Sequence, residues 1–174
     1  DRAEEMLRLR ARITAHELAA LGIDVNCAPL ADIATPTTHP VLRDRCYGAT
    51  PGAVTARARA VAEGLLAGGV LPVLKHIPGH GRATADSHRA LPRVGASAAE
   101  LRATDFAPFA ALADLPLGMT AHVVFDALDD RPATISPAMI RLIREELGFA
   151  GLLMTDDISM QALSGGGGAL AAAA

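Results

Sequence analysis

An acid and an imidazole stand two positions apart at Asp86 and His88, in a stretch that is rich in glycine and proline. A carboxylate beside an imidazole can orient the ring and raise its basicity, which prepares the ring to donate and accept protons. We predict that residues 77–97 form a loop, and loops of this length are usually functional or disordered. Taken alone, the spacing fits an Asx turn beside an exposed histidine more often than an acid–base pair.

Two further acids, Asp156 and Asp157, directly follow an apolar run at 151–155 that is typical of a buried strand. Because side chains alternate along a strand, these two carboxylates must point in different directions. One would face a site as a nucleophile or base, and the other would anchor the following loop or cap a helix. Either acid could serve as a helix N-cap, so the residues alone leave this choice open.

The chain has a single lysine, Lys75, at the end of a second apolar run. A lysine on a buried strand can have a lowered pKa and form a Schiff base with a carbonyl substrate. It can equally donate hydrogen bonds to substrate hydroxyl groups. The position of Lys75 in the sequence does not decide between these two roles.

A metal site is a weaker alternative for the same region. His76, His80 and His88, together with Asp86, could supply three or four ligands. A proline and a glycine separate the first two histidines, so no helix can hold them as an H-x-x-x-H pair. We therefore expect no metal ion and no other cofactor.

The elements that must position these residues alternate as helix and strand along the chain. Such alternation, with short and nearly continuous apolar strands, predicts an α/β fold with a parallel sheet whose strands are buried on both faces. Open doubly wound sheets and (β/α)₈ barrels share this pattern, and both carry their chemistry at the C-terminal ends of the strands. The expected helices span 1–21, 52–67, 97–113 and 137–147, the expected strands span 23–30, 70–75, 117–121 and 151–155, and residues 31–50 are expected to form a loop.

Composition excludes several classes of protein. Of the 174 residues 51% are hydrophobic and 20% are charged, which is too apolar for a disordered chain. The net charge of −3 and the absence of tryptophan disfavour a nucleic-acid or anionic-membrane surface. The apolar stretches are too short for a membrane-spanning helix. The two cysteines, Cys27 and Cys46, are expected to be buried or half-buried thiols in a reducing, cytoplasmic compartment.

Two long motifs resemble glycoside hydrolase family 3. The run KHIPGHG at 75–81, followed by DSH at 86–88, is similar to the K-H-[FI]-P-G-H-G-x₄-D-S-H motif of the β-N-acetylglucosaminidases (β-hexosaminidases) of that family. The segment 142–159, from a helix end through a strand to Asp156, is similar to the nucleophile segment of the family. Together with shorter matches the resemblance covers about residues 15–160, and it is nearest to the bacterial enzymes of peptidoglycan recycling.

The resemblance implies a (β/α)₈ barrel and a retaining glycosidase mechanism. Asp156 would be the nucleophile, and His88 would be the general acid/base with Asp86 as its partner. Most retaining glycosidases use two carboxylates, and here an Asp–His pair would replace the second carboxylate.

The resemblance also implies a role in sugar binding for Lys75, His76 and Arg45. This replaces the Schiff-base role of Lys75, and it disfavours a metal site. The expected partner is a small saccharide or muropeptide with terminal β-linked N-acetylglucosamine, with no nucleic acid and no membrane as partner.

The sequence departs from the family in two ways. It has no match to the family segment V-D-Q-E-G-G-R-V, and it holds about four strand–helix units where a barrel has eight. We expect residues 1–164 to form part of the N-terminal barrel domain and 165–174 to be a low-complexity tail. A half barrel would expose two strand edges, so we expect these residues by themselves to be poorly soluble or inactive.

Three alternatives remain. One is a non-catalytic carbohydrate-binding relative, which the presence of Asp86, His88 and Asp156 disfavours. Another is an aldolase-type barrel that uses Lys75. The third is a family 3 β-glucosidase, whose relatives typically carry Asp-Trp after the nucleophile strand, where this chain has Asp156 followed by Asp157.

Overall fold

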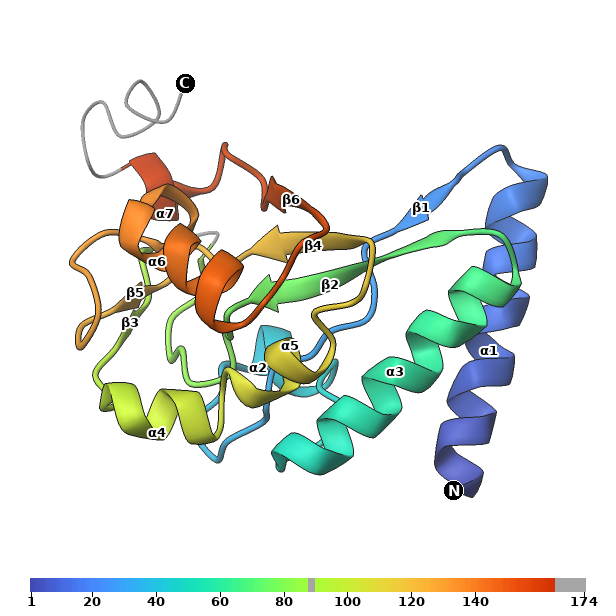
Figure 1. Ribbon diagram of the computed structural model, residues 1–174, viewed down its shortest axis with the longest axis horizontal. Helices are drawn as coiled ribbons and strands as arrows, with labels where there is room; N and C mark the ends of the chain where they lie inside the picture. The colour runs from blue at the N-terminus through green and yellow to red at the C-terminus, as the bar shows by residue number, and fades with distance from the viewer. Residues whose placement is uncertain (88–89, 165–174) are drawn as a thin grey trace.

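A parallel sheet forms the centre of the computed structural model, which describes residues 1–87 and 90–164 (Figure 1). Its four strands lie in the order β1-β2-β4-β6, and every neighbouring pair is parallel. The predicted α/β class and the parallel sheet are therefore confirmed. The strands are β1 (Val25–Asn26), β2 (Leu71–Ile77), β4 (Leu117–Thr120) and β6 (Leu152–Thr155).

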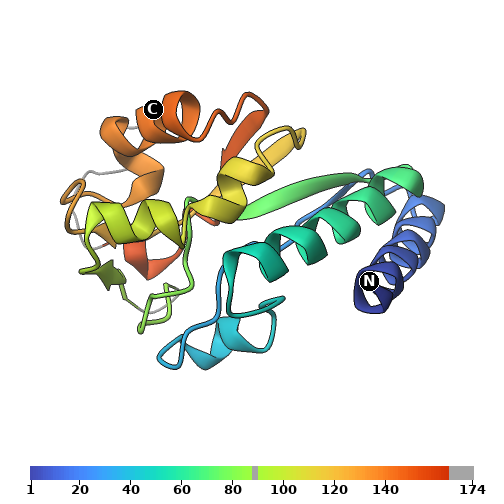
Figure 2. The same cartoon turned by 60° about the horizontal axis from the view of Figure 1, so that its bottom comes forward.

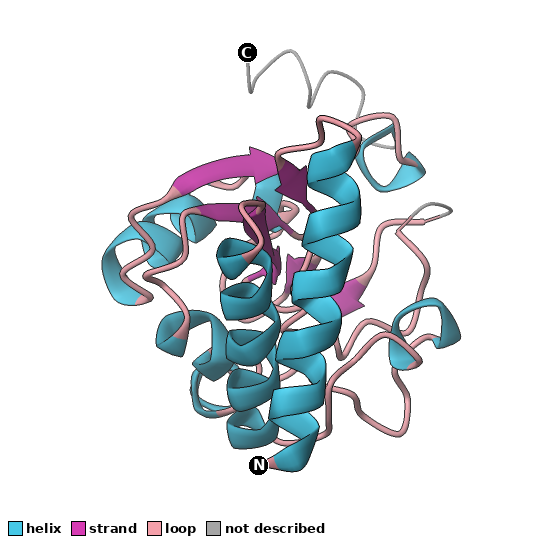
Figure 3. Cartoon of the chain, turned by 90° about the vertical axis from the view of Figure 1, so that its right-hand side faces the viewer, coloured by secondary structure: helices cyan, strands magenta, loops and turns pink. Residues whose placement is uncertain are grey.

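Two long helices, α1 (Arg2–Ala20) and α3 (Pro51–Ala67), pack side by side (Figure 3). Asp1 closes a capping box at the start of α1, and the Thr50 hydroxyl caps α3 just before Pro51. Gly64 allows the close approach of the two helices, because a Cβ atom there would lie 2.3 Å from the carbonyl oxygen of Arg8. Both helices match their predicted spans to within two residues.

Three shorter helices continue from α3 away from α1 (Figure 2). They are α4 (Ala98–Ala103), α5 (Ala107–Ala111) and α6 (Pro137–Arg141), which continues as a π turn, η2 (Leu142–Glu146). Their apolar side chains form the main core with β2 and β4, around the buried Phe106, Phe109 and Phe125. This core fixes the two central strands, and β2 carries the predicted site residues Lys75 and His76 near its C-terminal end.

The single helix expected over 97–113 is wrong, because the chain breaks it between α4 and α5. Thr104 leaves helical geometry with φ −124° and ψ −79°. The break lets the buried Asp105 carboxylate accept a hydrogen bond from Arg82 Nε at 2.7 Å, and it turns Phe106 into the core. A long-range ion pair and aromatic burial thus override helix propensity at this position.

Other local expectations also need correction. The strand expected over 23–30 is only β1, followed by an isolated bridge between Leu30 and Lys75, because Pro29 has no N–H to donate to a ladder. The predicted loops contain short elements that were not expected. These are α2 (Pro40–Arg43), the paired short strands β3 (Arg93–Val94) and β5 (Val124–Phe125), and a 3₁₀ turn η1 (Ala133–Ile135). After β6 the structure has α7 (Gln161–Ser164), where the family resemblance implies a helix.

Burial on both faces holds for β2 and β4 but not for the outer strands. Leu152 on β6 is 59% exposed and Val25 on β1 is also exposed, since each strand has one neighbour in the described sheet. Cys46 is half-buried as expected, but Cys27 follows the outer strand β1 and is exposed, so that expectation was wrong for one thiol. No helix within 1–87 and 90–164 is long and apolar enough to cross a bilayer.

Candidate active site

A small cavity at the C-terminal ends of the sheet strands collects several residues predicted from the sequence. Arg45, His76, Asp86 and Asp156 line it, together with Val41, Leu42, His80 and Ser87. Lys75 is half-buried on β2, next to His76, and does not line the cavity. His88 lies outside the described residues. The fold therefore brings together four of the six predicted site residues, which come from four different segments of the chain.

Asp32 and His76 form the most deeply buried polar pair of this region. The Asp32 side chain is fully buried, and its Oδ2 atom lies 2.7 Å from His76 Nδ1. Its Oδ1 atom accepts hydrogen bonds from the backbone N–H of His80 at 2.6 Å and of His76 at 3.5 Å. Burial alone would raise the pKa of Asp32, but the charge and hydrogen bond of His76 and the N–H of His80 together hold it below its usual value.

The Asp32 contact sets the direction of the His76 ring. Because the carboxylate is an acceptor, His76 Nδ1 donates the hydrogen bond, and Nε2 faces the other way. Nε2 lies 3.9 Å from Oδ2 of Asp156, the acid at the end of β6. His76 stands where the register between β2 and β4 shifts, and such irregularities redirect side chains near active sites.

Asp156 and Asp157 have different surroundings, as their alternation on the strand requires. The Asp156 carboxylate is partly exposed in the cavity, and its Oδ1 atom accepts the backbone N–H of Asp157 at 2.9 Å. Asp157 is exposed, and its side chain accepts the N–H of Ser159 at 2.8 Å in the turn after β6. Of these two neighbouring acids, Asp156 is the one that lines the cavity and can meet a ligand there.

Two cations border the site. Burial, and next the nearby charge of Arg45, lower the pKa of Lys75, while Asp156 and Asp32 partly oppose this shift. Arg45 is exposed and lies at the cavity wall. The cavity is thus lined by one cation, Arg45, and by the carboxylates of Asp86 and Asp156, which are groups that can exchange hydrogen bonds with the hydroxyl groups of a sugar.

Close packing and hydrogen bonds hold the loop that carries Asp86 at two points, Gly81 and Ser87. Gly81 is packed so closely that a Cβ atom would lie 2.0 Å from the carbonyl oxygen of Ile33, and its own carbonyl accepts the Thr38 hydroxyl at 2.6 Å. Next to Asp86, the Ser87 carbonyl accepts the N–H of Ala162 at 3.2 Å, on α7. The loop therefore bridges the first strand ends and the segment that follows Asp156.

Three residues of this region were not assigned a catalytic or sugar-binding role from the sequence, where His80 was named only as a possible metal ligand. Asp32 orients His76, although its place after the first predicted strand was a signal. His80 is 4% exposed, burial lowers its pKa, and its Nδ1 atom has no hydrogen-bond partner among the described residues. His122 is buried beside Asp157. Sequence spacing could not reveal these contacts, because the partners lie more than 30 positions apart in the chain.

The described residues contain no group of three or more His, Cys, Asp or Glu side chains placed to hold a metal ion. The Cys46 thiol near the site is also a poor ligand or nucleophile. Burial raises its pKa to about 12, and the charge of Asp32 adds to this effect.

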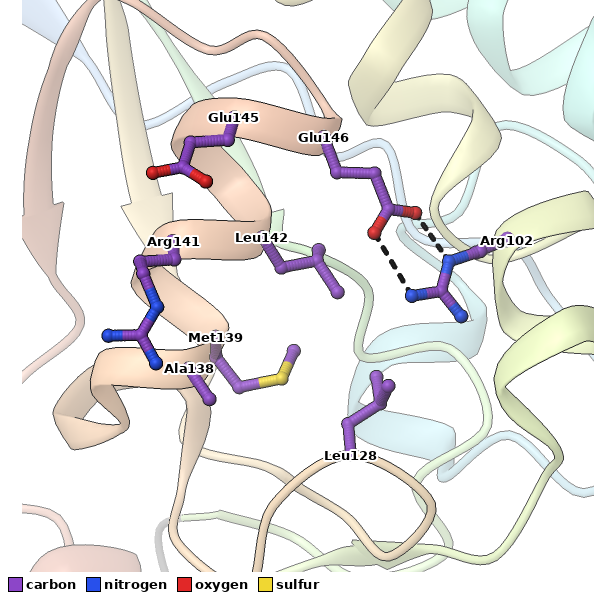
Figure 4. Close-up of a pocket in the computed structure, with 8 residues that line it drawn as sticks. All are labelled: Arg102, Leu128, Ala138, Met139, Arg141, Leu142, Glu145 and Glu146. Atoms are coloured by element: carbon purple, nitrogen blue, oxygen red, sulfur yellow. Dashed lines mark hydrogen bonds and ion pairs between the residues drawn. The ribbon is translucent and has the colours of Figure 1, made fainter.

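A second hollow lies on the outer helical side, between α4 and the α6–η2 segment (Figure 4). It measures about 330 Å³, and Leu128, Met139 and Leu142 form its apolar floor. Arg102 and Glu146 face each other across it and form two hydrogen bonds, one of them at 3.0 Å. Both of these side chains are exposed to solvent. This groove therefore lacks a buried acid–imidazole pair like the one beside the strand-end cavity.

Comparison with known proteins points to one family. The model of the glycosyl hydrolase family 3 N-terminal domain matches residues 2–174. A beta-hexosaminidase of Neisseria meningitidis serogroup C is 38% identical over 160 residues, which cover 90% of this chain and 44% of the relative. The chain therefore spans less than half the length of this curated relative.

Solved structures agree with this match. A family 3 beta-N-acetylglucosaminidase from Paenibacillus superposes with a TM-score of 0.88 at 38% identity, over 92% of this chain and 32% of that chain. NagZ from Neisseria gonorrhoeae, in complex with N-trifluoroacetyl-D-glucosamine, gives a TM-score of 0.85 at 36% identity, over 90% of this chain and 47% of that chain.

Proposed function

Since this chain belongs to the glycosyl hydrolase family 3 N-terminal domain family, a TIM-barrel type that is partial here, we propose that it supplies the catalytic centre of a retaining β-N-acetylglucosaminidase. The observation that carries this proposal is the position of Asp156. Its carboxylate ends a central-sheet strand and shares one cavity with Arg45, His76 and Asp86. Catalytic residues of barrel enzymes lie at such strand ends.

In the proposed mechanism Asp156 attacks the anomeric carbon of a terminal β-linked N-acetylglucosamine. A covalent bond forms between the carboxylate and the sugar while the bond to the leaving-group oxygen breaks. His88, paired with Asp86, gives its proton to that oxygen. The neutral imidazole then takes a proton from water, whose oxygen attacks the anomeric carbon and releases Asp156 with the β configuration retained.

Sugar binding is assigned to Arg45, Lys75 and His76. The Asp32 carboxylate fixes the His76 ring, so that Nε2 points toward Asp156 and the place of the bound sugar. This arrangement suits a ligand with several hydroxyl groups, and the gonococcal relative holds an N-acylated glucosamine analogue in its solved structure. Replacing a buried partner such as Asp32 would therefore disturb binding without touching the sugar.

We extend the proposal to the substrate and to the cellular compartment, because the sequence resembles enzymes of peptidoglycan recycling. The substrate would be the GlcNAc-1,6-anhydroMurNAc type of saccharide or muropeptide, and the reaction would take place in the cytoplasm. The β-glucosidase alternative is disfavoured because Asp157 follows the nucleophile and the Asp86–His88 motif is present.

The test is hydrolysis of 4-nitrophenyl N-acetyl-β-D-glucosaminide by the complete gene product that contains residues 1–174. We expect release of 4-nitrophenol with a β-configured first product, observed by NMR. Asp156→Asn should abolish this hydrolysis. The neighbouring Asp157→Asn is the matched control and should retain most of the activity. No turnover by the complete product, or equal turnover after Asp156→Asn, would overturn the proposal.

The substrate is tested by competition between two glycosides. We expect the 4-nitrophenyl N-acetylglucosaminide to be cleaved with a kcat/KM at least about 10²-fold above that of the 4-nitrophenyl glucoside, because a site built to bind a polar group discriminates against its absence. The opposite preference would support the β-glucosidase alternative. Anhydro-muropeptide disaccharide and chitobiose, supplied to the same protein, separate a recycling substrate from a chitin-type one.

A further inference from the structure

The position of Asp156 depends on contacts beyond the sheet. The β4–β6 ladder ends with Thr120 paired to Thr155, one residue before Asp156. The segment that follows is the turn at Asp157–Ser159, which is largely exposed. A carboxylate at the start of such a turn would sample several directions unless another group fixed the backbone there.

His122 provides a contact at this point. This residue, just after β4, is 1% exposed, and its Nε2 atom lies 3.1 Å from the carbonyl oxygen of Asp157. A carbonyl oxygen only accepts, so Nε2 must carry the hydrogen. The same residue, Asp157, donates its backbone N–H to the Asp156 carboxylate at 2.9 Å. The Asp157 backbone is therefore held by His122 at its carbonyl, and it directs Asp156 through its N–H.

A hydroxyl network fixes the state of the His122 ring. Its Nδ1 atom lies 2.7 Å from the Thr134 hydroxyl on η1, which is 2.9 Å from the Thr120 hydroxyl. Burial lowers the pKa of His122, and the Asp157 carbonyl and the charge of Asp156 partly oppose this shift. With its hydrogen on Nε2 as the donor to Asp157, the neutral ring can only accept at Nδ1, and the single hydrogen of the Thr134 hydroxyl is shared between Nδ1 and the Ala121 carbonyl oxygen, 3.1 Å away.

Thr120 contacts the same strand on the other side of Asp156. Its hydroxyl lies 3.4 Å from the carbonyl oxygen of Met154, on β6. The pair Thr120 and His122 therefore contacts the backbone both before and after Asp156. The polar groups involved come from β4, η1 and β6, which only the folded chain brings together.

We propose that His122 is a positioning residue for Asp156, which it holds in place through the Asp157 backbone. This inference rests on the proposed function, in which Asp156 is the nucleophile. It makes His122 a residue that never touches the substrate and yet controls the bond-forming step.

Two substitutions separate this role from a merely structural one. His122→Leu removes both ring contacts, and we expect kcat to fall about 10²-fold because a small displacement of a reacting group costs that much. KM should change less than about 2-fold, because Arg45, Lys75 and His76 remain in place. His122→Gln keeps an N–H near the Nε2 position and should recover about 10-fold of the lost kcat. Activities are compared per folded molecule, measured by circular dichroism.

A readout without substrate tests the geometry itself. Nitrogen NMR of ¹⁵N-histidine-labelled protein should show His122 as the neutral tautomer with hydrogen on Nε2. Thr134→Val removes the hydroxyl donor to Nδ1 and should shift this signal, whereas Thr134→Ser should not. The opposite tautomer in the unmodified protein would overturn the inference.

The failure of this inference can be told apart from failure of the proposed function. If the unmodified protein is active, Asp156→Asn is inactive and His122→Leu retains full kcat per folded molecule, then the inference is wrong and the function stands. If Asp156→Asn retains full turnover, then the proposed function is wrong and the positioning role falls with it.

Discussion

The Asp32–His76 pair beside the strand-end cavity and the Arg102–Glu146 pair of the outer groove in Figure 4 differ in burial. The Asp32 and His76 side chains are 0% and 7% exposed, whereas those of Arg102 and Glu146 are 43% and 40% exposed. Solvent screens the outer pair and can replace either partner. The inner carboxylate has no access to solvent, so its contacts are obligatory.

The volumes of the two hollows do not indicate which one contains the reactive groups. The groove measures about 330 Å³, and the strand-end cavity only about 20 Å³. The smaller space is lined by the carboxylate at a strand end, the oriented imidazole and the Arg45 guanidinium, which are groups that can do chemistry. The comparison shows that constrained polar contacts identify this site better than volume does.

The largest difference should appear when one carboxylate is neutralised in each region. Asp156→Asn should lower kcat about 10³-fold or more, because it removes the proposed nucleophile. Glu146→Gln should leave kcat within about 2-fold, since the groove takes no part in the reaction. Steady-state release of 4-nitrophenol measures both, and a comparable loss in the two variants would remove the distinction between the regions.

Loss of the buried acid should also affect stability. Asp32→Asn leaves a poorer acceptor for His76 and for the His80 N–H, and it should lower the free energy of unfolding by about 1–3 kcal/mol. Urea denaturation followed by circular dichroism gives this value. Glu146→Gln, as the matched exposed carboxylate, should cost less than about 1 kcal/mol. An equal cost at the two positions would contradict the importance given to burial.

The two acids should respond differently to pH and salt. The folded-state pKa values of Asp32 and Glu146 are both lowered, so each contributes stability above the unfolded value, near 3.9–4.3, that is lost as pH falls through the folded value. Unfolding free energies measured from pH 6 to pH 3 should therefore decline below about pH 4. In 0.5 M salt the loss of unfolding free energy caused by Asp32→Asn should persist, whereas the loss caused by Glu146→Gln should vanish. If the stability contributed by Asp32 also fell with salt, that would argue against a carboxylate shielded from solvent.

A cation in each region gives a further contrast, expected to be smaller. Lys75→Met should raise KM for the glucosaminide about 10-fold, because a hydrogen bond from a charged group to a sugar hydroxyl is lost. Arg141→Met, in the wall of the groove, should not change KM. Borohydride reduction in the presence of a carbonyl substrate should leave Lys75 unmodified; trapping would revive the Schiff-base alternative.

The smallest effect should be the coupling between Arg102 and Glu146. A double-mutant cycle with Arg102→Met and Glu146→Gln should give an interaction free energy below about 1 kcal/mol, as for other exposed pairs. Thermal or urea unfolding of the four proteins measures it. A coupling of several kcal/mol would mean that the groove is far less hydrated than its exposure indicates.

Much of the fold could be predicted because its signals are local. Pro51 at a helix start, helix caps at Ser97 and Ser136, and apolar runs ending near Lys75 and Thr155 mark elements within a few residues of their observed bounds. The break at Thr104–Phe106 and the β3–β5 pair escaped prediction, because they depend on Arg82 and on strand pairing across about 30 residues.

The candidate site divides in the same way. Asp86, His88 and Asp156 stand in motifs that can be read from neighbouring residues, so the sequence pointed to them. Asp32 and His122 act through partners that are 44 and 35 positions away, and no local pattern reports such contacts. Their importance became visible only when burial and hydrogen-bond geometry were known.

By itself, then, the sequence determined the helix–strand alternation, the parallel α/β class and the loops that carry the chemistry, because periodicity and capping act over one or two turns of chain. Only the tertiary structure decided which nitrogen of His76 faces Asp156, which strands are exposed and how His122 reaches the Asp157 backbone. These depend on the parallel sheet bringing distant strand ends to one edge, where burial makes each polar contact obligatory.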